Sequence, residues 1–150
     1  MDAEIRAARP DEVENVVELY EWLFEPPGRR PPAWDAKRAA VALRHAIDSH
    51  DSVVLIAEAE DGELIGICTA YQDLHSVRFG YRAWVEDLAV HPDRRSQEVG
   101  RRLLGAAMDW ARARGATHLE LDTAERRTDA QRFYERERPD RRSISYGWEL

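Results

Sequence analysis

Apolar and polar residues follow two periods along this chain, and each period predicts a different kind of element. Residues 4–8 can form a short first strand. Pro10 then suits the first turn of a helix, and apolar residues recur at helical spacing from Val13 to Phe24. The Pro-rich stretch 26–32 must end this helix. A second helix is expected over residues 34–48.

The middle of the chain carries the clearest strand signals. Residues 53–57 are apolar and β-branched, and Asp61-Gly62 is typical of a hairpin turn before a strand at 64–68. A loop is expected over 75–81 and a strand over 83–90. A helix over 99–114, a strand over 118–122, a helix over 129–137 and a closing strand over 143–148 follow. This order predicts one α/β domain, residues 1–150, with a mixed sheet flanked by helices.

The polar loop between the strand at 83–90 and the helix at 99–114 is a candidate anion site. Backbone N–H groups at the start of a helix point outward unpaired and, with the helix dipole, attract negative charge. Arg94, Arg95, Arg101 and Arg102 add local positive charge to an acidic chain. The pattern indicates a pyrophosphate site; the alternative is an ordinary strand–helix connection with solvated arginines.

Two motifs resemble those of the GNAT-type N-acetyltransferase superfamily. The run Arg95-Ser96-Gln97-Glu98-Val99-Gly100 matches the first and last positions of its Arg/Gln-x-x-Gly-x-Gly/Ala motif. The run Ala130-Gln131-Arg132-Phe133-Tyr134-Glu135 resembles its tyrosine motif, Ala-x-x-Phe/Leu-Tyr-Glu. The resemblance covers the whole chain in element order and is specific from about Trp84 to Arg136. It implies a GNAT-like mixed central sheet and direct attack of an amine on acetyl-CoA.

The resemblance also implies where the acyl donor binds and where CoA, the product, is released. The expected contacts are Leu88, Ala89, Val90, Arg95, Ser96, Gln97, Glu98, Val99, Gly100 and Arg101. Glu98 stands where the family has a glycine, and a carboxylate 4 Å from pyrophosphate would be repelled by about 1 kcal/mol in water. Glu98 is therefore expected to point to solvent or to pair with a neighbouring arginine. Arg127 and the run Glu137-Arg138-Pro139 are further departures from the family pattern.

An amine must lose a proton before it attacks a thioester. With a pKa near 10.4, about one alkyl amine in 2,500 is neutral at pH 7, which accounts for roughly 4.6 kcal/mol of the barrier. Glu86 is the candidate base, because the pair Glu86-Asp87 is similar to a Glu-Asp pair of polyamine acetyltransferases in this superfamily. Strand alternation places the two carboxylates on opposite faces unless a bulge intervenes. The alternative for each is a solvated carboxylate at a strand edge.

The remaining candidates complete the predicted site. The resemblance implies that Tyr134 protonates the departing thiolate; the alternative is a core aromatic beside Phe133. Asp87, Asp122 and His75 are candidate substrate contacts. Cys68 is expected to be an inert core thiol, and the five histidines have no metal-ligand spacing, so no metal is expected.

Charge and composition narrow the class of partner. The 29 acidic residues exceed the 22 basic ones, for a net charge of −7. This argues against nucleic acid as a partner and is compatible with a cationic substrate. The alternative, which the charge taken alone favours, is that the net charge only keeps the protein soluble. The single cysteine favours a reducing, cytoplasmic setting. The first residues lack the pattern of a signal peptide and no apolar run is long enough for a membrane span, so no membrane partner is expected.

The leading hypothesis is an acetyltransferase acting on a primary amine of a small polycation, either an aminoglycoside antibiotic, with a role in resistance, or a polyamine-like molecule. One alternative is an enzyme that acetylates a protein or peptide amine. Another is a non-catalytic acyl-CoA-binding sensor, which the Glu98 departure suggests. A homodimer through the aromatic loop near Tyr71 to Trp84 or through the last strand is possible.

Overall fold

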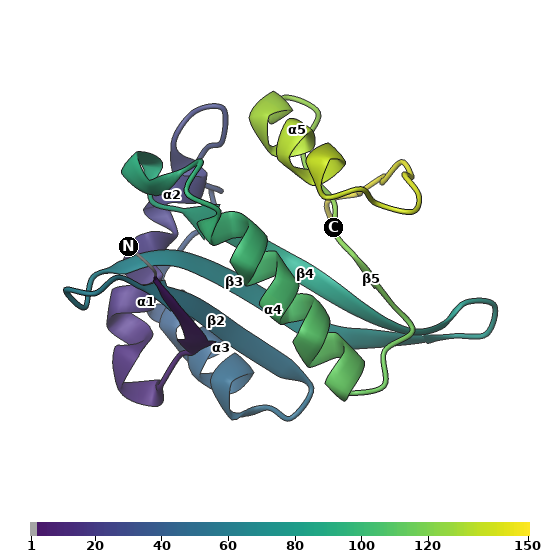
Figure 1. Cartoon of the computed structure of the whole chain (residues 1–150), viewed down its shortest axis with the longest axis horizontal. Helices are drawn as coiled ribbons and strands as arrows, with labels where there is room; N and C mark the ends of the chain where they lie inside the picture. The colour runs from purple at the N-terminus through teal and green to yellow at the C-terminus, as the bar shows by residue number, and fades with distance from the viewer. Residues whose placement is uncertain (1–2) are drawn as a thin grey trace.

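A five-stranded mixed sheet organises the chain in the computed structural model, which describes residues 3–150 (Figure 1). The strands lie in the order β1-β2-β3-β4-β5, with antiparallel pairing except for the parallel pair β4–β5. Their bounds are β1 Glu4–Ala7, β2 Ser52–Glu58, β3 Leu64–Ser76, β4 Gly80–Val90 and β5 His118–Glu120. The mixed sheet and the α/β class predicted from the sequence are confirmed.

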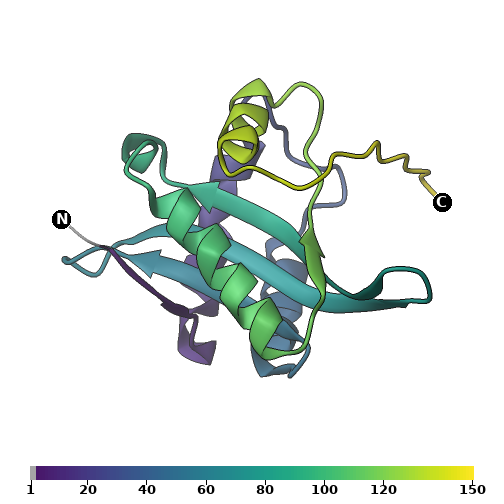
Figure 2. The same ribbon diagram turned by 45° about the vertical axis from the view of Figure 1, so that its right-hand side comes forward.

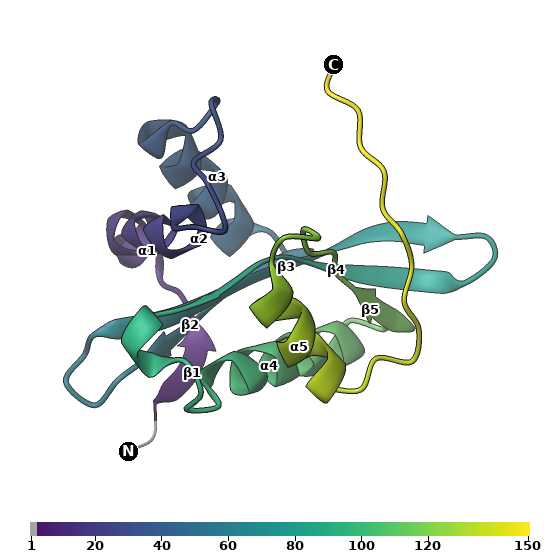
Figure 3. The ribbon, with the colours of Figure 1, turned by 90° about the horizontal axis from the view of Figure 1, so that it is seen from above.

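Helices cover both faces of this sheet. Three helices, α1, α2 and α3, lie on one face, and α4 and α5 lie on the other (Figure 3). The bounds are η1 Pro10–Glu12, α1 Val13–Leu19, α2 Glu21–Phe24, α3 Ala36–Asp48, η2 Pro92–Arg94, α4 Val99–Ala113 and α5 Thr128–Arg136. The helix predicted up to Phe24 is divided at Tyr20 into α1 and α2. Within residues 3–150, no helix has both the length and the apolar composition needed to cross a bilayer.

Each face of the sheet has its own core. Val13 and Val16 of α1 pack with Ile56 and Ile67 on the α1–α3 face, while Leu103 of α4 packs with its neighbours on the other. Helix α4 lies directly on the sheet at Gly66, where a Cβ atom would lie 2.8 Å from Leu103 Cδ1. This close approach fixes the start of α4 beside the end of β4.

The loop predicted over residues 75–81 is shorter in the structure, where only residues 77–79 form a turn. On either side of it β3 and β4 extend as a long hairpin arm, residues 72–84, that projects beyond the sheet (Figure 1). Neither face of the arm is covered, so its sequence lacks the apolar alternation that marks a half-buried strand. Polar and aromatic contacts hold it instead. Arg82 pairs with Asp73 at 2.6 Å, and His75 stacks on Tyr81 with ring centroids 3.7 Å apart.

The closing strand predicted over residues 143–148 is also wrong. The alternating pattern is real, but an isolated strand leaves its backbone groups without partners, and no strand within residues 3–150 pairs with this segment. Its apolar side chains are largely exposed, at 77% for Ile144, 77% for Tyr146 and 81% for Trp148.

A charge cluster joins the start of the chain to the sheet. Glu12 is buried and accepts two hydrogen bonds from the Arg6 guanidinium, at 2.8 and 2.7 Å, and one from the Arg9 backbone N–H at 2.8 Å. Arg6 also donates to Glu58 at 3.3 Å. The Arg6 side chain, helped by the Arg9 backbone, lowers the pKa of Glu12 to about 2.

Replacing Glu12 by glutamine should lower the free energy of unfolding at pH 7 by about 2–3 kcal/mol, because the Arg6 charge loses its buried partner. A carboxylate with a depressed pKa stabilises the fold above its unfolded value near 4.5 and ceases to do so as the pH falls through about 2. Urea unfolding should therefore show that the free energies of unfolding of the wild type and of Glu12→Gln converge between pH 4.5 and 2. Glu14→Gln, which removes an exposed partner of Arg44, is the control and should change stability by no more than about 0.5 kcal/mol.

Candidate active site

Strand β4 loses its parallel neighbour halfway along its length. It pairs with β5 only at Arg82↔His118, Ala83↔Leu119 and Trp84↔Glu120, yet it runs on to Val90. From residue 85 onward, no strand of the described chain lies on that side, and we call this stretch the open edge of β4 (Figure 2). Part of its backbone N–H and C=O groups therefore point away from β3 and are available to a ligand. The predicted contacts Leu88, Ala89 and Val90 lie on it.

The loop after the open edge has the backbone geometry of an anion site. Ser96 and Glu98 have positive φ angles of 71° and 65°, and such left-handed residues alternating with ordinary ones turn successive N–H groups toward one concavity. Glu98 is the N-cap of the 15-residue helix α4 and makes no side-chain cap hydrogen bond. The N–H groups of the first turn are therefore left for another acceptor. The predicted contacts Arg95 to Arg101 all lie on this loop and turn.

The Glu98 side chain faces solvent. It is 71% exposed and pairs with Arg101 at 3.5 Å, and Arg101 also lies 3.6 Å from Glu137, the residue after α5. The expectation that Glu98 faces solvent and pairs with an arginine is confirmed. Its positive φ explains why a glycine is favoured here, since a side chain in the left-handed region costs about 1 kcal/mol or more.

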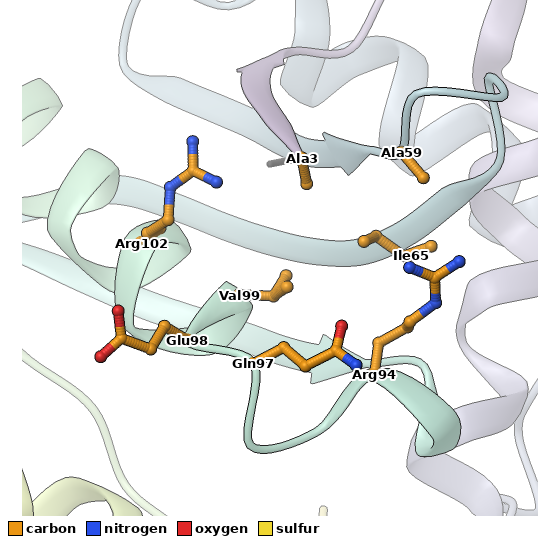
Figure 4. A pocket seen from close by; sticks show the side chains of 8 residues that line it. All are labelled: Ala3, Ala59, Ile65, Arg94, Gln97, Glu98, Val99 and Arg102. Carbon is orange, nitrogen blue, oxygen red and sulfur yellow. The ribbon is translucent and has the colours of Figure 1, made fainter. Parts of the chain in front are cut away.

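A small hollow of about 80 Å³ lies beside the start of α4 (Figure 4). It is lined by Ala3, Ala59, Ile65, Arg94, Gln97, Glu98, Val99 and Arg102. Arg94 and Arg102 reach into it from the two ends of the loop. Because neither guanidinium forms an ion pair within residues 3–150, the hollow adds positive charge next to the candidate anion site.

A β-bulge brings the two predicted carboxylates to one face of the sheet. Thr69 pairs with Asp87 and Ala70 with Val85, so Glu86 is the extra residue of β4. Simple alternation would have placed Glu86 and Asp87 on opposite faces. Both instead face the α1–α3 layer, where each contributes to raising the pKa of Tyr20.

The two carboxylates have different surroundings. Asp87 is half-buried, and its Oδ2 accepts hydrogen bonds from the Tyr20 hydroxyl at 2.8 Å and from the Thr69 hydroxyl at 2.7 Å. Glu86 is exposed, and its Oε1 accepts from Trp84 Nε1 at 3.1 Å and from the Tyr71 hydroxyl at 3.3 Å. Each carboxylate keeps one oxygen that accepts no hydrogen bond from the described residues, so the two differ mainly in exposure: Asp87 is half-buried and Glu86 is exposed.

The tyrosines around these carboxylates remain protonated at neutral pH. Burial, followed by the nearby Asp87, raises the pKa of Tyr20, and burial together with Glu86 raises that of Tyr71 to about 12. Tyr20 and Thr69 were not predicted as site residues. In the sequence, Tyr20 belongs to the apolar stripe of the first helix. Its contact with Asp87 depends on the bulge in β4, which the sequence pattern does not reveal.

Tyr134 lies on the opposite face of the sheet, on α5. It packs against the α4-side core, with its ring edge-on to Phe133 at a centroid distance of 5.2 Å. Burial and the neighbouring Cys68 raise its pKa to about 12, so its hydroxyl carries a proton at pH 7. Cys68 is fully buried and burial raises its pKa to about 12, which agrees with an inert core thiol.

Two arginines tie the segment before α5 to α2 and to the segment that follows α2. Arg126 Nε donates to the Pro27 carbonyl at 2.7 Å, and Arg127 Nη2 donates to the Leu23 carbonyl at 2.8 Å. Arg127, which departs from the family motif, therefore has a structural role. The contacts fix α5, and Tyr134 with it, relative to the helices that face the carboxylates.

The other two predicted substrate contacts lie apart from this group. His75 lies in the hairpin arm, stacked on Tyr81 and eleven residues before Glu86 in sequence. Asp122 is exposed just after β5. The structure does not bring either residue to Glu86 and Asp87, and their roles stay predictions.

Comparison with known proteins shows that this chain is similar to N-acetyltransferases. The acetyltransferase (GNAT) family matches residues 14–138. The uncharacterized N-acetyltransferase YhfO of Bacillus subtilis is 39% identical over 103 residues, which cover 69% of this chain and 68% of YhfO. The aminoalkylphosphonate N-acetyltransferase of Salmonella typhimurium is 36% identical over 77 residues, 51% of this chain and about half (50%) of that enzyme.

A solved structure has the same fold. AAC(6')-Iy in complex with the bisubstrate analogue CoA-S-monomethyl-acetylneamine superposes with a TM-score of 0.82 at 19% identity, covering 100% of both chains. At this identity the likeness establishes the arrangement of sheet and helices and leaves the choice of acceptor open.

Proposed function

The chain belongs to the acetyltransferase (GNAT) family, and from this premise we propose that its acceptor is a primary amine of a small polycation, of aminoglycoside or polyamine type. It is an acetyl-CoA-dependent N-acetyltransferase, as its family and relatives are. The bulge that turns Glu86 and Asp87 to one face carries the proposal, because it creates a paired negative site on the side of the sheet that faces α1 to α3.

The residues of the strand end and loop fit acetyl-CoA. We assign the pyrophosphate to the uncapped first turn of α4 and the loop from Arg95 to Arg101, where the N–H groups converge. The backbone of Leu88 to Val90 on the open edge of β4 supplies further hydrogen-bonding groups. When bound, acetyl-CoA supplies the activated thioester; the chain's own residues supply the proton transfers.

Glu86 is assigned the role of general base. Its exposed carboxylate accepts the proton of the acceptor ammonium, directly or through one water molecule, and so produces the neutral amine that attacks the thioester carbon. Tyr134 donates its phenolic proton, or a hydrogen bond, to the sulfur as the carbon–sulfur bond breaks. The task of Tyr134 matches its protonation state, because burial raises its pKa to about 12 and the hydroxyl keeps its proton at neutral pH.

The surroundings of Asp87 suit a cation. Its hydrogen-bonded Tyr20 stacks on Trp34 with centroids 5.7 Å apart, and Trp34 meets Phe24 edge-on at 4.8 Å. Aromatic faces attract ammonium groups, and the effect adds to that of a nearby carboxylate. The net charge of −7 favours the approach of the same ligands.

A second candidate acceptor carries an acidic group beside its amine, as the name of the Salmonella relative indicates for that enzyme. Release of free CoA thiol from acetyl-CoA, measured against aminoglycosides, polyamines, aminoalkylphosphonates and peptides, separates the candidates. Polycations should give the highest kcat/KM. CoA binding without thiol release from any amine would instead indicate a sensor.

Replacing Glu98 by glycine should leave the fold intact and strengthen acetyl-CoA binding by a few-fold. Glycine removes both a carboxylate near the proposed pyrophosphate position and a strained left-handed side chain. Calorimetry at low and moderate salt should show the gain shrinking with salt, because screening weakens the removed repulsion. Glu98→Gln separates the two causes, since it removes the charge and keeps the strain. A loss of binding above tenfold in the glycine variant would mean that the Glu98–Arg101 pair orders the loop.

We further propose that the protein works as a homodimer in the cytoplasm. The fully buried, unpaired thiol of Cys68 fits a reducing compartment.

A further inference from the structure

The arginine at the start of α5 is a half-buried cation with no acidic partner in residues 3–150. Arg127 is the N-cap residue of α5, and its Nη2 donates to the Leu23 carbonyl at 2.8 Å. This contact is with a neutral group, and no carboxylate of the described chain forms an ion pair with the guanidinium. Charges that are partly removed from water usually have a partner of opposite sign. Arg127 is therefore suited to a group that becomes negative only during the reaction.

The loop after α2 holds this guanidinium in place. Gly28 of that loop lies against it: a Cβ atom added there would be 2.4 Å from Arg127 Nη2 and 2.0 Å from the Leu23 carbonyl oxygen, so a side chain would displace both. The loop runs beside α5 (Figures 1 and 2). On the α5 side, Gln131 Nε2 donates to the Ala124 carbonyl at 3.1 Å and fixes the turn from which the arginine extends. The position of the cation is thus set by contacts from both sides.

Arg127 and Tyr134 lie on one face of α5. They are seven residues apart, which is about two turns of helix, and residues at this spacing face the same side. Burial raises the pKa of Tyr134 to about 12, and Cys68 adds to the rise, whereas the positive charge of Arg127 acts in the opposite direction. The charge of Arg127 therefore reaches the Tyr134 hydroxyl.

A nearby cation helps Tyr134 to donate its proton. A free alkyl thiol such as that of cysteine has a pKa of about 8.5, well below the value of about 12 that burial gives the Tyr134 hydroxyl. Proton transfer from this phenol to a departing thiolate is therefore uphill in the acid strengths of the two groups. The burial that keeps the proton on Tyr134 at neutral pH also penalises the phenolate that forms without it. A positive charge close to that oxygen lowers the penalty.

We propose that Arg127 is a positioning residue that acts through Tyr134, because its charge offsets the negative charge that the phenolic oxygen acquires when Tyr134 gives up its proton. As the amine nitrogen attacks the thioester carbon, the electron pair of the carbon–sulfur bond goes to sulfur, and sulfur takes the proton of Tyr134. The nitrogen sheds a proton as it becomes the amide, and a proton returns through solvent to the phenolate. The inference rests on the proposed role of Tyr134 and does not depend on which amine is acetylated.

A double-mutant cycle on Arg127 and Tyr134 tests the inference. Arg127→Met keeps an unbranched side chain and removes the charge. It should lower kcat about 10-fold, while the Kd for acetyl-CoA changes by less than about threefold. In a Tyr134→Phe background, which has no phenolic proton to lose, the same substitution should lower kcat by less than about twofold. Arg127→Lys, which keeps the charge, should have a kcat within about threefold of the wild type.

Arg126→Met is the matched control. Arg126 is exposed and its Nε donates to the Pro27 carbonyl at 2.7 Å, so this variant removes a guanidinium–carbonyl contact of the same kind from the neighbouring position. Its kcat should stay within about twofold of the parent protein in both backgrounds. If Arg127→Met does not fold, Arg127→Gln, which keeps an N–H donor for Leu23 and removes the charge, serves in the same cycle.

Three results would overturn the inference. Equal losses of kcat for Arg127→Met in the two backgrounds would show that Arg127 acts independently of Tyr134. An equal loss in Arg126→Met would show that the tie between the segments matters and the charge does not. A higher Kd for acetyl-CoA with an unchanged kcat would make Arg127 a contact of the acyl donor. The proposed function fails on a different result, namely a Tyr134→Phe protein with the turnover of the wild type.

Discussion

Replacing Tyr134 by phenylalanine should lower turnover about 100-fold while acetyl-CoA binds with unchanged affinity, a loss in the range that general acid catalysis supplies. The variant loses one hydroxyl, and the ring still fills its place beside Phe133 in the α4-side core. Because burial raises the pKa of this hydroxyl to about 12, it remains a donor across the whole physiological range. The reaction that lacks it must expel an unprotonated thiolate.

Calorimetry with acetyl-CoA and steady-state thiol release together check this prediction. Tyr146→Phe is the control, since that hydroxyl lies on the exposed C-terminal segment, and its turnover should equal that of the wild type. A Tyr134→Phe protein that unfolds at the normal temperature and turns over at the normal rate would remove Tyr134 from the chemistry and leave it a core aromatic.

Glu86→Gln and Asp87→Asn should affect different kinetic constants. Glu86 has a free carboxylate oxygen and faces solvent. The Glu86→Gln variant should therefore have a kcat lowered by about 100-fold or more. It should also lack the fall in rate on the acidic side of the pH profile. Asp87 is held by Tyr20 and Thr69 and acts through its charge. The Asp87→Asn variant should mainly have a higher KM for the amine substrate, and the increase should be larger at low ionic strength.

Asp109→Asn, an exposed substitution on α4, controls for the change in net charge and should alter neither constant. If Asp87→Asn lowers kcat more than Glu86→Gln and abolishes the acidic limb, the two roles are reversed. If neither substitution changes either constant, the bulged carboxylates do not serve the reaction.

The strand–loop–helix connection at residues 90–99 and the sheet core were predictable because short-range patterns determine them. The β-branched run at 53–57 and the helical period from Val99 to Ala113 each report on one buried face, which any fold must cover. Glu98 could be placed in solvent from charge alone. The left-handed backbone conformation of Glu98 could not be predicted, because it follows from how the loop joins β4 to α4.

The site itself depends on contacts between distant segments, which local patterns do not record. The bulge at Glu86 arises from a register shift between β3 and β4, and it is the exception that allows the two carboxylates to share one face. The roles of Tyr20 and Thr69 follow from that shift. The length of the hairpin arm and the state of the C-terminal segment were also mispredicted. An exposed arm has no buried face that would impose an apolar pattern on its sequence. A segment with a strand pattern, in turn, forms a strand only when another strand pairs with it.

Competition between acceptors tests the central claim most directly. Equal concentrations of an aminoglycoside, a polyamine, an aminoalkylphosphonate and an acidic peptide share one reaction with limiting acetyl-CoA, and mass spectrometry counts the acetylated products. The bulged pair Glu86 and Asp87, with the aromatic residues beside Asp87, predicts that the acetyl group goes mainly to the two polycations and that added salt reduces their advantage. Preferential acetylation of the aminoalkylphosphonate or of the acidic peptide at low salt would contradict it.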